Sequence, residues 1–272
     1  MPRPVHAVDF MARLADIKRE NSHYITNLFK WSPEVRNLVE QGALFFSETP
    51  GCILVGIPVR NAFIRLYYCA TAANRLSKAL GIFCQAHAVS LPLICDIIGR
   101  EASVRKSAAI FLHNGFSVRR RLRRVEATES RRFVDMESSA EFAKTEDAEK
   151  IAEILGKEFD IYLELPSAEE LQQWLARREG ILIRKGRNII ALHLFSIRGR
   201  CLHGRFAWVN EAYRRTPAFL ELNAMLLRIL RERRIVRVYG WRDEARSLRA
   251  CPALGEKPED MVDYIMLREG KA

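Results

Sequence analysis

Short apolar runs separated by turn residues alternate with helical patterns along the chain. In the first half, Thr49-Pro50-Gly51 and Arg60-Asn61 interrupt three apolar segments, which is typical of an antiparallel strand meander. Apolar residues at helical spacing predict helices before and after the meander, and Gly115 ends the last of them. The expected elements are helix 10–30, strands 43–48, 52–59 and 62–69, helix 72–86, strand 91–98, helix 104–114 capped by Ser103, and strand 116–125.

The second half repeats this order of elements without repeating the residues. A polar, acidic stretch over 128–149 separates the halves, and Ser167 is a suitable cap for a helix that begins at Ala168. The expected elements are helices 147–159 and 168–177, strands 180–184, 188–197 and 202–209, helix 218–233, strand 235–241, helix 244–250 and a closing strand 262–268. The pattern predicts an α/β protein with mixed sheets and two domains, 1–135 and 136–272.

Composition agrees with a folded protein of two domains. The chain has 272 residues, of which 49% are hydrophobic and 28% charged, which is far from the composition of a disordered protein. No apolar run approaches the length of about 20 residues that crosses a bilayer, and residues 1–10 lack a secretory apolar segment. We therefore expect a cytoplasmic protein without a membrane span.

Six cysteines are widely spaced and form no C-x-x-C pair. No histidine stands at metal-ligand spacing beside them, so the pattern predicts reduced, mostly buried thiols and no metal site.

A net charge of +11 indicates a surface that attracts anions. The densest basic run, 119–124, falls on an expected strand, where alternate side chains point to opposite faces. A charged edge strand is the preferred interpretation, because charge on an edge discourages further pairing. A nucleic-acid surface is the alternative.

Two short passages carry recognisable motifs, the segment 110–116, IFLHNGF, and the segment 207–215, AWVNEAYRR. The first is similar to the end of the late helix in the GNAT family of N-acetyltransferases, and the second resembles that family's fourth strand and the approach to its acyl-CoA site. The element order matches the family fold twice, from about residue 42 onward. The resemblance implies tandem GNAT-like domains and transfer of an acyl group, most often acetyl, from acetyl-CoA or another acyl-CoA to an amine.

In this family the CoA diphosphate lies on backbone amides that open the long helix, where the helix dipole favours negative charge. The resemblance assigns cofactor binding to Trp208, Val209, Arg214, Arg215, Thr216 and Ala218.

The loop departs from the family pattern, because it has no glycine, Pro217 removes one amide donor and Phe219 adds bulk. Its arginines either compensate by binding phosphate or are solvated beside an ordinary helix cap. The matching loop 70–75 also lacks glycine, so the N-terminal domain is expected without CoA.

For the chemistry, Glu211 is the best-placed base just past the fourth strand, followed by Asp243 and Glu244. Cys251 stands where many family members carry the tyrosine acid, which leaves Tyr213, Tyr239 or Tyr264, and Tyr213 is our choice. His193 and His203 are interpreted as hydrogen-bonded structural residues, and Trp208 and Trp241 as core residues or pocket walls. A non-catalytic binding or scaffold protein that keeps the fold is the alternative function.

Overall fold

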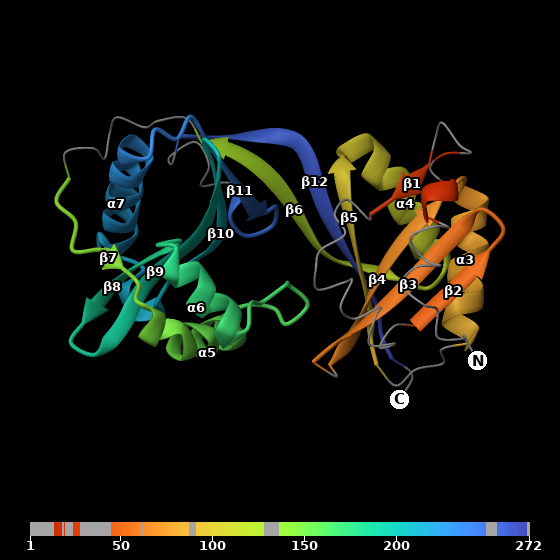
Figure 1. Ribbon diagram of the computed structural model, residues 1–272, viewed down its shortest axis with the longest axis horizontal. Coiled ribbons are helices and arrows are strands. Elements are labelled where there is room, and N and C mark those ends of the chain that lie inside the picture. Colours follow the sequence, from red (N-terminus) through yellow and green to blue (C-terminus); the bar gives the residue numbers. More distant parts are fainter. Residues whose placement is uncertain are drawn as a thin grey trace. The chain divides into compact units, whose positions relative to one another are not determined.

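The computed structural model describes residues 14–17, 19, 24–27, 45–60, 62–86, 91–127, 136–248 and 255–270. The chain forms two compact units (Figure 1). Unit 1 comprises Met1–Leu122 together with Asp260–Ala272, and unit 2 comprises Arg123–Glu259. The expected domains 1–135 and 136–272 have a single boundary. The compact units have two boundaries, after residues 122 and 259, because the C-terminal segment belongs to unit 1.

Unit 1 is built on the predicted meander. Strands β2 (Phe45–Thr49), β3 (Cys52–Val59) and β4 (Phe63–Ala70) pair antiparallel in sequence order. The short strand β1 (Ile25–Thr26) pairs antiparallel with β4. Helix α3 (Ala73–Ala86), strand β5 (Leu93–Arg100), helix α4 (Glu101–His113) and strand β6 (Ser117–Ala127) follow.

The last strand of the chain, β12 (Glu256–Arg268), completes unit 1. It pairs antiparallel with β5 from Met261↔Arg100 to Arg268↔Leu93. Its alternate residues Val262, Tyr264 and Met266 are buried in the core that α3 and α4 cover. Placing the closing strand 262–268 in the second half was therefore wrong, because its apolar face fills the core of unit 1.

Unit 2 begins with β7 (Glu141–Phe142), the 3-10 turn η2 (Thr145–Asp147), and helices α5 (Ala148–Glu158) and α6 (Ala168–Ala176). The meander β8 (Gly180–Lys185), β9 (Asn188–Arg198) and β10 (Cys201–Val209) leads through η3 (Glu211–Tyr213) to α7 (Ala218–Glu232) and β11 (Arg237–Asp243). The strand order is β11-β10-β9-β8-β7.

Alternating strand residues supply two apolar layers in unit 2. Leu182, Leu192 and Trp208 belong to the core that contains residues of α5 and α6. Ala191 and Phe195, from the other face, belong to the core that contains residues of α7. The sheet is therefore covered by α5 and α6 on one face and by α7 on the other.

Local signals had mixed outcomes. Ser167 caps α6 as predicted, since its hydroxyl accepts a 3.2 Å hydrogen bond from the Glu170 amide. Ser103 does not cap α4, which starts earlier, at Glu101. Residues 25 and 26 form a strand rather than part of helix 10–30, most of which lies outside the described residues. The described part of 244–250 forms turns and no α-helix.

The arginine run on β6 is not at an edge, because β12 and β11 flank this strand. Arg123 binds Glu244 through a 2.8 Å hydrogen bond from Nε, and Arg124 pairs with Glu259. The edge-strand interpretation was wrong, and two arginines of the run are neutralised by carboxylates.

The described cysteines are free, and four of them, Cys52, Cys69, Cys84 and Cys95, are buried, as predicted. Burial raises the pKa of the Cys52 thiol to about 12. Cys251 lies outside the described residues. Among the described helices, none is both long and apolar enough to cross a membrane.

Candidate functional site

Strands β10 and β11 separate in the middle of unit 2. They pair in parallel only from Cys201↔Arg237 to His203↔Tyr239, although β10 continues to Val209 and β11 to Asp243. A β-bulge lies between Gly204 and Phe206, directly after the last paired residue. A bulge bends its strand and interrupts the ladder, so an opening forms between the two strands beyond this point.

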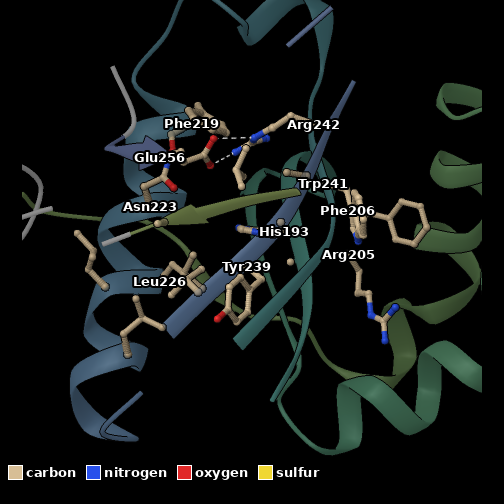
Figure 2. Close-up of a pocket in the computed structure, with 18 residues that line it drawn as sticks. His193, Arg205, Phe206, Phe219, Asn223, Leu226, Tyr239, Trp241, Arg242 and Glu256 are labelled. Carbon is tan, nitrogen blue, oxygen red and sulfur yellow. Dashed lines mark hydrogen bonds and ion pairs between the residues drawn. The ribbon is translucent and has the colours of Figure 1, made fainter. Parts of the chain in front are cut away.

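A pocket of about 100 Å³ occupies this opening (Figure 2). Residues of β9, β10, β11 and α7 line it, together with the end of β6 and the start of β12. Most of the wall is apolar or aromatic, and Phe219, Leu226, Leu230, Val238 and Trp241 contribute to it. An apolar concavity with a few polar groups is the usual form of a ligand site.

Polar side chains interrupt the apolar wall at five places. Arg242 and Glu256 face each other in Figure 2 and form an ion pair, with 2.8 Å between Arg242 Nε and Glu256 Oε2. The Asn223 amide donates to the Phe219 carbonyl at 2.8 Å. Tyr239, His193 and Arg205 are the other polar lining residues, and the Arg205 guanidinium points away from His193 in Figure 2. The Arg242 guanidinium and the Glu256 carboxylate neutralise each other.

His193 is half-buried and lines the pocket. Desolvation, reinforced by the nearby charge of Arg242, lowers the pKa of its imidazole from the ordinary 6.5 to about 4. The ring is therefore neutral at physiological pH. Among the described residues no hydrogen bond to it is found, and its ring contact is with Phe195, at 6.1 Å between centroids. The described residues thus offer no hydrogen bond in support of the interpretation of His193 as a hydrogen-bonded structural residue, and its role stays a prediction.

Unit 1 has a gap at the same position of its fold. Strands β4 and β5 pair in parallel only at Ile64↔Leu93 and Arg65↔Ile94, and β4 then continues to Ala70. The side chain of Asn27 fills this gap. Its amide donates to the Leu66 carbonyl of β4 at 3.0 Å and to the Asp96 carbonyl of β5 at 3.1 Å.

Further bonds fix the segment that carries Asn27. Its side-chain oxygen accepts from the Tyr68 amide at 2.7 Å, and the Thr26 hydroxyl donates to the Tyr68 carbonyl at 2.6 Å. The polar groups at this gap of unit 1 are thus satisfied by the chain itself.

The loop predicted to bind the cofactor joins β10 to α7. Arg214 and Arg215 are exposed, and Arg214 Nε lies 3.4 Å from the Val209 carbonyl. The Thr216 hydroxyl donates to the Tyr213 carbonyl at 2.7 Å. No described residue accepts a hydrogen bond from the amides of Phe219 and Leu220 in the first turn of α7. Two amide donors and two arginines therefore remain at this helix end.

The other predicted residues lie around this loop. Trp208 is buried in the core on the α5 and α6 side, and its Nε1 has no partner among the described residues. Val209 and Ala218 pack in the core beneath α7. Glu211 is exposed at the start of η3, and the Tyr213 ring lies 5.4 Å from Lys185 Nζ.

None of the eight predicted site residues lines the pocket, whereas His193, Gly204, Arg205, Phe206 and Asn223 do. Sequence reasoning had one unused signal for this position. A single glycine within an apolar strand indicates a bulge or the close approach of another group, and Gly204 is such a residue.

Comparisons with known proteins support the fold assignment. A GCN5-related N-acetyltransferase from Sphaerobacter thermophilus is 13% identical, with a TM-score of 0.61 over 82% of this chain and 78% of that one. Another from Kribbella flavida is 14% identical, with a TM-score of 0.54 over 88% and 93%. A tandem GNAT protein from the clavulanic acid biosynthesis pathway is 13% identical, with a TM-score of 0.52 over 82% and 80%. No protein-family model and no curated protein matches the sequence.

These likenesses and the element order define the class of fold. The chain has a mixed α/β architecture of two tandem GNAT-like domains, as the sequence predicted. At identities of 13–14% the likeness concerns the fold, and function has to be argued from the site.

Proposed function

We propose that unit 2 is an acyl-CoA-dependent N-acyltransferase and that unit 1 does not bind acyl-CoA. The observation that carries this proposal is the contrast between the two strand gaps. In unit 2 the gap between β10 and β11 holds a pocket, whereas in unit 1 the gap between β4 and β5 is filled by Asn27. The acceptor is an amine, as the GNAT-like fold suggests.

The residues present suit an acyl-CoA. The free amides of Phe219 and Leu220, with Arg214 and Arg215 nearby in sequence, provide donors and positive charge for a diphosphate. The apolar wall with isolated polar groups suits the extended arm that follows the diphosphate. Pro217 offers no amide, so the site relies on the arginines more than a glycine-rich loop would.

The proposed reaction is direct attack. The amine nitrogen adds to the thioester carbonyl, the carbon–sulfur bond breaks, and the amide and CoA are the products. A base takes the proton that the amine loses, and an acid supplies one to the departing thiolate. Glu211 and Tyr213 are the candidates from the sequence, and neither of them lines the pocket. Both residues belong to η3, which follows β10 directly.

Titration calorimetry with acetyl-CoA tests the binding site. We expect the variant Arg214→Ala/Arg215→Ala to bind at least about tenfold more weakly than the parent protein, because charge-assisted hydrogen bonds to phosphate are lost. The control Arg231→Ala/Arg233→Ala removes the same charge from the other end of α7 and should bind like the parent protein. Absence of heat with the parent protein at millimolar acetyl-CoA would overturn the proposal.

Release of free CoA from acetyl-CoA across a panel of amines tests the chemistry. Glu211→Gln tests the candidate base: turnover at least about tenfold lower with unchanged acetyl-CoA affinity would support that role, and unchanged turnover would exclude it. The part-buried Asn27 and the glycine-free loop favour a second candidate, a binding protein that kept the fold without the reaction. Binding of acetyl-CoA without CoA release for any amine would support that candidate.

A further inference from the structure

His193 is a polar side chain in the pocket without a hydrogen-bond partner among the described residues. The residue is half-buried rather than enclosed in the core, so its ring nitrogens can be reached from the pocket. A core position would require a bond to a neighbouring carbonyl or hydroxyl. A position at a ligand site explains the free ring nitrogens, because the partner arrives with the ligand.

Gly204 leaves the imidazole accessible from the pocket. A Cβ atom at this position would stand 3.4 Å from His193 Nε2, in van der Waals contact with the ring. Any larger residue at 204 would cover that nitrogen. Both residues line the pocket, and Figure 2 shows His193 at the centre of the group of lining side chains.

The position of His193 and Gly204 relative to α7 indicates which part of an acyl-CoA reaches His193. Gly204 follows His203, the last residue of β10 that pairs with β11, so it marks the closed end of the gap. The free amides of α7 lie beyond the other end of β10, after η3. A donor whose diphosphate sits at α7 and whose arm enters the gap therefore brings its acyl end toward Gly204 and His193.

We propose that His193 hydrogen-bonds the acyl end of the donor and that the pocket selects donors with an uncharged acyl group. This inference rests on the proposed function of unit 2. The ring is neutral and offers one donor and one acceptor, which suits a thioester carbonyl. Arg242 is already paired with Glu256, and the guanidinium of Arg205 points away from His193 in Figure 2, so a carboxylate beside His193 would be desolvated without a neighbouring cation.

Calorimetry on the parent protein, two pocket variants and two control variants tests the role of His193. We expect His193→Phe to bind acetyl-CoA about tenfold more weakly, because one hydrogen bond is lost. Gly204→Ala keeps the imidazole but covers Nε2, and should weaken binding to a similar extent. The matched controls are His113→Phe, on α4 of unit 1, and Gly156→Ala, whose added methyl would meet no atom within 4 Å. Both should bind like the parent protein.

Side-chain ¹⁵N spectra of histidine provide a readout that a structural role would not change. The His193 ring signals should move on addition of acetyl-CoA to the parent protein and should stay in place in Gly204→Ala. Succinyl-CoA, which carries a carboxylate, should bind at least about tenfold more weakly than acetyl-CoA, because an unpaired charge is costly to bury.

The outcomes separate the two proposals. If the parent protein does not bind acetyl-CoA, the proposed function fails and this inference with it. If the parent protein binds and both pocket variants bind equally well, with the His193 signals unmoved, the inference alone is overturned. Equal affinities for succinyl-CoA and acetyl-CoA would overturn the selection for uncharged donors.

Discussion

Replacing Asn27 tests whether its side chain holds the gap of unit 1 closed. The Asn27→Ala change removes two hydrogen bonds to carbonyls, at 3.0 and 3.1 Å, and one from the Tyr68 amide, at 2.7 Å. It also removes a weaker contact with the Cys95 thiol at 3.4 Å. Three backbone groups that the side chain had bridged would then lack their partner.

The magnitude follows from the cost of leaving backbone groups unpaired. Each such group costs about 1–3 kcal/mol when it stays dry, and less when water enters the space that the amide vacates. Because Asn27 is only part-buried, the lower end applies, and we expect unfolding of unit 1 to be about 2–4 kcal/mol easier. For a protein of this size that lowers the unfolding midpoint by roughly 5–10 °C.

Thermal and urea unfolding monitored by circular dichroism measure this change. Asn74→Ala, at an exposed position in the first turn of α3, is the matched control and should stay within about 0.5 kcal/mol of the parent protein. Asn27→Asp keeps the acceptor for Tyr68 but loses both carbonyl bonds, and should destabilise at least as much as alanine. An Asn27→Ala protein as stable as its parent would refute the idea that this side chain fills the gap.

Three further predictions concern stability. Folding lowers the pKa of His193 from 6.5 to about 4, so between these pH values the unfolded chain binds a proton that the folded protein does not. The free energy of unfolding should therefore be unaffected by this group above pH 6.5 and should fall by roughly 2–3 kcal/mol toward pH 4. Urea midpoints at several pH values should show this decline, and His193→Phe should show less of it. Met266→Ala should cost about 2–5 kcal/mol by cavity formation in the core of unit 1, which calorimetric unfolding should detect. Burial raises the pKa of Asp147, but the hydrogen bonds from Arg184 and from the Lys144 amide have the larger combined effect, so the pKa is lowered. Asp147→Ala should therefore destabilise unit 2 at neutral pH, and should destabilise it less in acid, where the carboxylate is protonated. Equal loss at both pH values would contradict the last prediction, and Glu146→Ala, an exposed neighbour, is its control.

Local features of the fold could be predicted from sequence because they depend on nearby residues. The apolar run 52–59 became β3 with the same bounds, and the helix expected over 218–233 became α7 (Ala218–Glu232). Gly115 ends α4 in the left-handed conformation, with a φ of 81°, as its position predicted. These signals act within a few residues of one another, where periodicity and backbone preferences decide the structure.

Two features could not be predicted in this way: the strand with which β12 pairs, and the residues of the pocket in unit 2. Periodicity shows that 262–268 has an apolar face, but it does not show which core that face enters. His193 alternates with core residues along β9, so its pattern is that of a buried structural residue. The pocket depends on the register of β10 against two neighbours, which a single sequence does not contain.

The two units show that a repeated order of elements does not imply a repeated function. In each, two parallel strands pair briefly and then separate, which leaves polar groups at the gap that something must satisfy. In unit 1 that role falls to Asn27, from a segment far away in the sequence. In unit 2 His193 has no such partner among the described residues. A gap that the chain itself fills contributes to stability, whereas one that keeps a pocket can bind a ligand. Asn27 and His193 are therefore the two positions where replacement should separate the stability of this fold from its proposed acyl-CoA binding.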